Sequence, residues 1–257
     1  NPEWGAKKLY KVLERESAPE VPSRSAINNI LNRNGLISLE KSTKASPWQR
    51  FEHERPNELW QMDFKGYFAL LNKQTCHPLT ITGDHSRVNI CLDACANQTY
   101  TTVQDALIAV FKKYGLPDAI LADNGSPWST TGNNPTTGER GFSKLEIWLI
   151  KQNIRIVHGR PYHPQTQGKE ERFHRTLKSE LLQYNDFKDL KQCQNAFNAW
   201  RIKYNNYRPH EAIDMQTPIT RYQASNRCFK ETTTPPLYAE NEFVVNVKTN
   251  GIISFNK

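Results

Sequence analysis

Residues 163–182, HPQTQGKEERFHRTLKSELL, are the stretch around which the rest of the chain can be organised. A polar segment ends at Gly168, and apolar residues then recur at every fourth position, at Phe173, Leu177 and Leu181. That spacing is typical of one face of an α-helix, and the proline and glycine of the polar segment are typical of a turn. The stretch therefore predicts a short turn that leads directly into a helix.

Two adjacent glutamates, Glu170 and Glu171, lie in the first turn of this predicted helix. Carboxylates are common there because they favour the positive end of a helix, so the pair alone indicates little. Side chains three and four apart share a face, which places Glu171 above His174, Arg175 and Lys178 and leaves Glu170 beside the apolar stripe. A carboxylate followed by cations suits a site for metal and phosphate. We therefore interpret Glu171 as the chemical residue and Glu170 as a flanking charge.

Two aspartates upstream are candidate partners for Glu171. Asp63 lies in LWQMDFKGYFAL, an apolar and aromatic run that predicts a strand. Asp123 follows the short apolar run 119–122 and precedes Asn-Gly, which predicts a strand that ends at a turn. Taken singly, Asp63 has an alternative as an outward strand residue, and Asp123 has one as an ordinary turn former.

Three motifs, WQMD, ADNG and HPQTQGKEE, occur in this order and resemble the signatures of the transposase and retroviral-integrase superfamily that carries an Asp-Asp-Glu triad. The resemblance implies that Asp63, Asp123 and Glu171 are the catalytic and metal-binding residues. In the family's PQ-S/T-QG pattern the glutamate falls seven residues after the proline, and Pro164 leads in this way to Glu171.

The wider chain, with WGAKKLY, NNYRPHEAI and TNGIISF, looks most like a bacterial insertion-sequence transposase. One departure from the family is visible between Asp123 and Glu171, where 47 residues intervene (171 − 123 − 1). This interval is longer than the thirty-five-residue gap typical of the integrases. We expect the excess in SPWSTTGNNPTTGERG.

The chemistry of cutting or joining DNA needs oxygen ligands of this kind. In-line displacement at phosphorus develops charge on the attacking and the leaving oxygen, and two Mg²⁺ roughly 3.5–4 Å apart can hold both. Magnesium prefers oxygen ligands and retains several waters, so three carboxylates and a substrate phosphate meet its needs. We expect two Mg²⁺ per site, with Mn²⁺ as a substitute. No paired Cys or His spacing typical of zinc is present.

Composition narrows the class of protein. Among 257 residues, 34 are Lys or Arg and 26 are Asp or Glu, which gives a net charge of +8 and favours a polyanionic partner. Five cysteines, an odd number without metal spacing, indicate a reducing compartment. No apolar run approaches the roughly 20 residues that cross a bilayer, and no signal peptide is visible. We expect a cytoplasmic bacterial protein that is nucleoid-associated when bound to DNA. The chain begins at Asn1, as a piece of a longer polypeptide would.

Residues 1–36 predict two helices, the first capped by Asn1 and the second by Ser23. A helix-turn-helix segment that reads the major groove fits this pattern, and a helical hairpin without a DNA role is the alternative. Ile27, Ile30 and Leu31 are expected on the inner face of the second helix. The outward residues would be Ser25, Asn28, Asn29, Asn32 and Arg33.

The remaining chain divides into a linker at 37–56, a catalytic core at 57–185, a helical extension at 186–225 and a C-terminal β segment at 226–257. Within the core we expect strands at 59–68, 78–84, 88–94, 119–122 and 154–158 and helices at 101–114 and 142–153. This order predicts an α/β fold with a mixed sheet flanked by helices. The resemblance implies a ribonuclease-H-like core and, at the C-terminus, the incomplete start of a small barrel.

Several further residues have two interpretations. Asp84, in GDHSR, is either a fourth acidic candidate or an ordinary turn residue. Lys203, Arg208 and His210 either line the DNA path or belong to a capping helix and a surface loop. The polar loop 126–141 is expected to order on DNA, with Trp128 against a neighbour or an unpaired base and Arg140 near phosphate.

The combined prediction is a DNA transposase that cleaves the ends of its element and transfers the strands into target DNA. Two alternatives remain, a non-catalytic DNA-binding protein on the same fold and a plain nuclease of that fold. The expected partners are double-stranded DNA and further copies of the chain, as a homodimer or higher multimer, without a membrane.

Overall fold

The structure is a computed structural model that describes residues 3–16, 20–37, 52–129, 141–159 and 168–231. The strands of its sheet are β1 (Leu59–Phe64), β2 (Phe68–Ala69), β3 (Thr75–Gly83), β4 (Asn89–Cys95), β5 (Ala119–Ala122) and β6 (Arg155–His158). The helices are α1 (Ala6–Arg15), α2 (Arg24–Arg33), α3 (Tyr100–Tyr114), α4 (Lys144–Lys151), α5 (Gly168–Glu180) and α6 (Leu190–Asn206). Short 3-10 helices follow at Leu182–Tyr184, Glu211–Ile213 and Pro218–Arg221.

The sheet is mixed, as the element order predicts. Strand β4 pairs with β3, and β1, β5 and β6 follow in that order, while β2 pairs with the start of β3. The β3 pairs with β1 and β4 are antiparallel, whereas β1, β5 and β6 run parallel. The predicted fold class, a mixed sheet flanked by helices, is confirmed.

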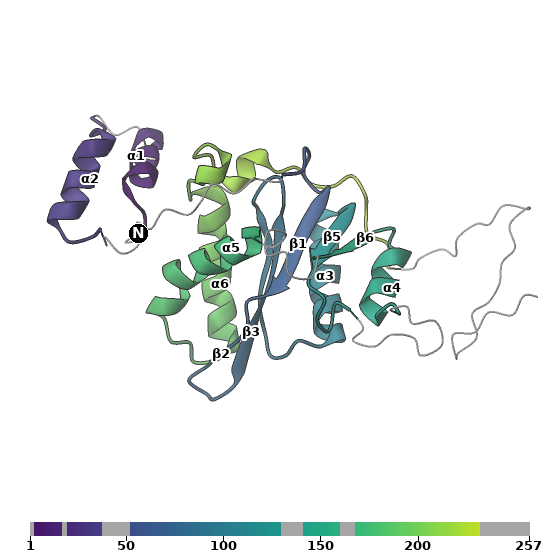
Figure 1. The fold of residues 1–257 in the computed structure, drawn as a ribbon. Helices are drawn as coiled ribbons and strands as arrows, with labels where there is room; N and C mark the ends of the chain where they lie inside the picture. The colour runs from purple at the N-terminus through teal and green to yellow at the C-terminus, as the bar shows by residue number, and fades with distance from the viewer. Residues whose placement is uncertain (1–2, 17–19, 38–51, 130–140, 160–167, 232–257) are drawn as a thin grey trace, which may run out of the picture.

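Helices cover both faces of the sheet (Figure 1). On one face Met62 and Ile81 pack with Leu107 of α3 and Leu149 of α4. On the other face an aromatic cluster joins α5 to α6, with Phe173, Leu177, Phe197 and Trp200 as members. Helix α6 lies against β4 and therefore belongs to the same packed body as the sheet.

The predicted strand at 59–68 is in fact two strands. β1 ends at Phe64 and β2 begins at Phe68, because the chain turns at Gly66, whose φ of +85° lies in the region that glycine adopts most readily. The other core elements lie within a few residues of their predicted bounds, and the helices at 101–114 and 142–153 are α3 and α4.

The N-terminal segment contains two helices, as predicted, but the start of the first helix and the buried face of the second differ from the prediction. Helix α1 begins at Ala6 with Gly5 as its N-cap, and not near Asn1. Ser23 caps α2 by accepting a hydrogen bond of 3.2 Å from the Ala26 amide. Ile30, predicted inside, is 52% exposed, since α2 buries only Ile27. A helix-turn-helix role for this pair stays a prediction.

Glu180, at the end of α5, ties the N-terminal segment to the core. Its carboxylate accepts hydrogen bonds from Trp4 Nε1 at 3.0 Å, Trp200 Nε1 at 3.3 Å and Arg208 Nε at 2.8 Å. At the other end of α1, Arg15 donates to the Met215 carbonyl at 2.7 Å. Helix α1 is thus attached to both α5 and the segment after α6.

Among the described segments, no helix combines the length and the apolar character that crossing a membrane would need. The C-terminal hairpin predicted within 226–257 lies almost entirely outside the described residues, as do Arg140 and residues 130–139 of the predicted loop.

Candidate active site

The sheet brings Asp63 and Asp123 to the same edge. β1 and β5 run parallel with Gln61 opposite Leu121, and each aspartate lies two residues further along its own chain. Because side chains alternate along β1, Met62 enters the core on the α3 face while Asp63 lies on the face that α5 covers. The predicted meeting of two strand ends is therefore present.

Asp123 is held by its own turn and by a neighbouring strand. Its Oδ1 accepts a hydrogen bond of 2.8 Å from the Gly125 amide. Its carbonyl accepts one of 2.8 Å from Nδ1 of His158, the last residue of β6. His158 Nε2 lies in turn 2.8 Å from the buried Glu146, which caps the start of α4. The backbone at Asp123 is consequently fixed by two elements.

The two glutamates at the start of α5 lie in different environments. Glu171 is exposed, whereas Glu170 is fully buried against β3, with Thr80 Oγ1 3.0 Å from its Oε2 and a hydrogen bond to Thr82. Burial raises the pKa of Glu170 to about 8, so this carboxyl is protonated at neutral pH. The interpretation of Glu170 as a flanking charge is therefore wrong, although its separation from Glu171 by helix face is correct.

The carboxylates at this edge influence one another. Burial, together with the charges of Asp123 and Glu171, raises the pKa of Asp63 to about 7. Glu170, whose pKa is about 8, is protonated at neutral pH and adds no charge to this group of carboxylates. Within the described residues, no three His, Cys, Asp or Glu side chains form a ready-made metal cage. The three carboxylates are nonetheless near enough for the charges of Asp123 and Glu171 to act on Asp63.

Of the three basic residues predicted on one face of α5, one is not exposed and not cationic. Arg175 and Lys178 are exposed as expected. His174 turns inward, with Nε2 2.8 Å from Thr80 Oγ1 and Nδ1 3.9 Å from Asp63 Oδ2, and burial lowers its pKa to about 3. His174 is therefore a neutral neighbour of Asp63 and carries no positive charge.

Lys65 is a cation that sequence reasoning missed. Burial lowers the pKa of Lys65, and so does the positive charge of Lys178. The available signal was its position two residues after Asp63, because alternate residues of an extended chain lie on the same side.

Asp84 has a structural role, as the turn interpretation favoured. It is buried and accepts hydrogen bonds from Gln61 Nε2 at 2.7 Å and the His53 amide at 2.9 Å. It also pairs with Lys169, the second residue of α5. Burial alone would raise the pKa of Asp84, but the Lys169 ammonium holds it below the usual value. This pair fixes the start of α5, and therefore Glu171, to the end of β3.

The other residues predicted to contact DNA lie partly on the exposed face of α2 and partly at or after α6. Asn28, Asn29, Asn32 and Arg33 are exposed along α2. Lys203 Nζ lies 5.5 Å from the centre of the Trp4 ring.

Arg208 is buried in its ion pair with Glu180, so the alternative in which it belongs to the capping helix and its loop describes it better. Trp128 packs in the core, 5.4 Å from the Phe64 ring, which is the neighbour that its prediction allowed.

Two models of the integrase core domain match the chain, over residues 53–164 and 152–218. An uncharacterized 39.2 kDa protein of insertion element IS476 from Xanthomonas euvesicatoria is 25% identical over 228 residues, which are 88% of this chain and 57% of that protein. An uncharacterized 31.7 kDa protein of insertion element IS407 from Burkholderia multivorans is 24% identical over 235 residues, 87% of this chain and 76% of the relative. The chain thus spans a little over half the length of the first relative and three quarters of the second.

The fold is also similar to that of a chain in the simian T-cell lymphotropic virus intasome, whose cryo-electron microscopy structure contains the PP2A regulatory subunit B56 gamma. The TM-score is 0.55 at 18% identity, and the match covers 99% of this chain and 85% of the viral one. At this identity the likeness supports the fold alone.

Proposed function

Because the chain belongs to the integrase-core superfamily, among the bacterial insertion-sequence transposases, we propose that it cleaves DNA at the ends of its element and transfers the freed strands into target DNA. The reaction is hydrolysis at each end followed by attack of the freed 3′-OH on a target phosphate. Asp63, Asp123 and Glu171 form the catalytic triad. The protein acts on double-stranded DNA in the bacterial cytoplasm, at the nucleoid.

One observation carries this proposal, the convergence of three carboxylates from separate parts of the chain. The pKa of Asp63 is raised to about 7 by burial and by the charges of Asp123 and Glu171. Carboxylates that repel one another lower the stability of the folded protein. Groups whose pKa is perturbed in this way cluster at functional sites.

The donor set fits magnesium. All three side chains offer oxygen, and a cation between them would relieve the repulsion that raises the pKa of Asp63. Mg²⁺ also retains waters and binds substrate phosphate, so it does not need a complete protein cage. When bound, two Mg²⁺ would stabilise the charge that develops on the attacking and leaving oxygens, and Mn²⁺ would substitute.

The residues around the triad orient it and bind DNA. His158 fixes the carbonyl of Asp123, and the pair of Asp84 with Lys169 fixes the first turn of α5. Arg175 and Lys178 extend from the same face as Glu171 and bind phosphates beside the site.

Residues 1–36 recognise the ends of the element and 57–185 carry the chemistry. Joining two ends requires a homodimer or a higher multimer on DNA.

A strand-transfer assay with pre-cut element ends and target DNA tests the proposal. Asp63→Asn, Asp123→Asn and Glu171→Gln should each abolish transfer while end binding survives, because the DNA contacts lie mostly elsewhere. Glu170→Gln is the matched control and should retain activity, since it replaces a carboxyl that is already neutral. EDTA should stop the reaction, and Mg²⁺ or Mn²⁺ should restore it.

The same assay distinguishes the alternatives. Cleavage without joined products would identify a plain nuclease, and end binding without either product would identify a non-catalytic DNA-binding protein. Loss of activity in Glu170→Gln with retention in Glu171→Gln would overturn the assignment within the pair.

A further inference from the structure

Two cysteine side chains meet on the face of the sheet that α6 covers. Cys76 lies in β3, and Cys193 lies in the first turn of α6, 117 positions later in the chain. Both side chains are fully buried, and their sulfur atoms are 3.9 Å apart. A disulfide holds its sulfurs about 2.05 Å apart, so a movement of roughly 2 Å, shared between the two side chains, would join them.

The surroundings of the pair protect both sulfurs while the core is closed. Leu92, Phe187 and Phe197 belong to the same buried cluster as the two cysteines. Contact with Cys193 and burial raise the pKa of Cys76 well above its usual range, so this group is a thiol at neutral pH. Because the thiolate is the reactive form, the pair resists oxidation as long as the cluster stays closed.

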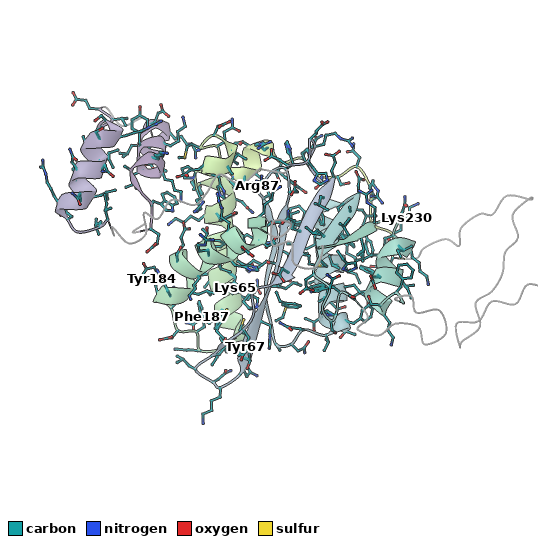
Figure 2. The ribbon with its side chains drawn as sticks, in the orientation of Figure 1. Lys65, Tyr67, Arg87, Tyr184, Phe187 and Lys230 are labelled. Carbon is teal, nitrogen blue, oxygen red and sulfur yellow. The ribbon has the colours of Figure 1, made fainter. Side chains whose placement is uncertain are left out.

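Two phenylalanine rings cover the pair at one corner of the molecule. Phe68 of β2 lies opposite Cys76 in the β2–β3 pairing, and directly opposite residues share a face of a sheet. The Phe68 ring is 6.1 Å from that of Phe187, which Figure 2 shows at the corner between β2 and the start of α6. Both rings also line a surface groove of about 340 Å³. They therefore stand between solvent and the cluster that contains the cysteines.

The backbone at this corner is held by few hydrogen bonds. Strand β2 is only two residues long. After it, the Leu71 amide donates to the Phe187 carbonyl at 2.9 Å. The Asn72 amide donates to the Lys188 carbonyl at 3.2 Å. Segments held by so few contacts open locally at a lower free energy than the whole domain unfolds. Each opening admits small molecules to the thiols, and each closure returns the two sulfurs to contact.

We propose that Cys76 and Cys193 are a redox-sensitive pair, which a small hydroperoxide converts into a disulfide that fastens α6 to the sheet. One sulfur loses its proton to solvent and attacks a peroxide oxygen, the O–O bond breaks, and a sulfenic acid and water form. The second sulfur attacks the sulfenic sulfur, the S–O bond breaks, and the hydroxyl leaves as a second water. Two thiols thus lose two protons and two electrons, and one hydrogen peroxide becomes two waters.

The cross-link would join the sheet to the helical extension and restrain the helix between them. Helix α5 packs on α6 through Phe173, whose ring centroid is 5.6 Å from that of Trp200. Fastening α6 to β3 therefore also limits the movement of α5. The inference is independent of the proposed function, since none of its observations involves DNA or the three carboxylates.

The test uses the full chain with Cys228→Ser, which removes an exposed cysteine that could link two molecules. The protein is treated with hydrogen peroxide in native buffer, the remaining thiols are alkylated in urea, and the peptides are mapped by mass spectrometry. A Cys76–Cys193 cross-linked peptide should appear, and dithiothreitol should remove it. The melting temperature of the oxidised protein should rise by about 10 °C, because the cross-link closes a long loop.

Two cysteine variants test the pairing. Cys193→Ala should abolish the cross-link. Cys95→Ala, which removes a buried cysteine of the neighbouring strand β4, should leave it intact. A link between Cys76 and Cys95, or oxidation of single sulfurs without any cross-link, would refute the pairing.

Two phenylalanine variants test the route of entry. Phe187→Ala removes one of the covering rings and should speed cross-linking severalfold. Phe229→Ala makes the same change in the core on the opposite face of the sheet, against Phe111, and should leave the rate unchanged. Equal acceleration in both variants, or cross-linking only at urea concentrations that unfold the protein, would show that oxidation follows global unfolding, and the proposed redox sensitivity of the folded protein would be wrong.

Discussion

Replacing Glu170 by glutamine should change how the stability of the protein depends on pH. Glu170 is 1% exposed beneath the first turn of α5 and hydrogen-bonds to Thr80 and Thr82. Burial raises its pKa from 4.5 to about 8. A carboxyl whose pKa is higher in the folded state contributes stability that is complete below the unfolded pKa and is lost as pH rises through the folded pKa.

The magnitude follows from these two values. Between pH 5 and pH 8 the folded protein holds a proton that the unfolded chain releases, so each pH unit removes about 1.4 kcal/mol of stability. Over this window the wild type should lose about 4 kcal/mol relative to Glu170→Gln, whose amide is neutral at every pH. Glutamine also retains an acceptor and a donor for the two threonine hydroxyls.

Urea denaturation in EDTA at pH 5, 6, 7 and 8 measures this difference. The stability of Glu170→Gln relative to wild type should rise steadily across the series. A constant difference between wild type and Glu170→Gln would mean that Glu170 is ionised in the folded protein, and the burial argument would fail.

Two other predictions concern the Lys169–Asp84 ion pair at the start of α5 and the recognition of DNA sequence by α2. Lys169→Ala should destabilise the protein by about 3 kcal/mol in urea denaturation, because it leaves the buried Asp84 carboxylate without its ammonium partner. Adding Asp84→Asn should recover part of that loss, and a double variant no more stable than the single one would contradict the pairing. The triple variant Asn28→Ala, Asn32→Ala, Arg33→Ala should bind element ends and unrelated DNA alike, since these exposed side chains are our candidates for base contacts. Retained preference for the end sequence in a competition assay would exclude α2 as the reading helix.

Much of the site was predictable because its signals are local. The four-residue spacing at Phe173 and Leu177 predicts the helix and the face it buries, and the same spacing separates Glu170 from Glu171. Asp123 was predictable because a short apolar run before Asp-Asn-Gly indicates where a strand ends.

What the sequence left open depends on pairs of residues that are distant along the chain. Asp84 meets Lys169 across 85 residues, and no periodicity reports that contact. Arg208 looks like a surface cation in the sequence, and only folding brings it to the buried Glu180. The predicted burial of Ile30 was wrong for a related reason. A segment of two helices buries only a narrow stripe, so an apolar residue at helical spacing can still lie outside it.

Helix α5 has Glu171 in its first turn and Glu180 at its last residue, about 14 Å away along the axis at 1.5 Å per residue. Because Glu180 holds Trp4, the segment that is proposed to read DNA is attached to the helix that is proposed to hold metal. If the helix has two positions and each ligand favours one of them, the two binding free energies become interdependent. Under this arrangement, an end sequence that shifts α1 changes the affinity for Mg²⁺, and Mg²⁺ changes the affinity for that sequence by the same factor. Discrimination between correct and incorrect ends would then appear as a difference in metal requirement, before any bond in the DNA is broken.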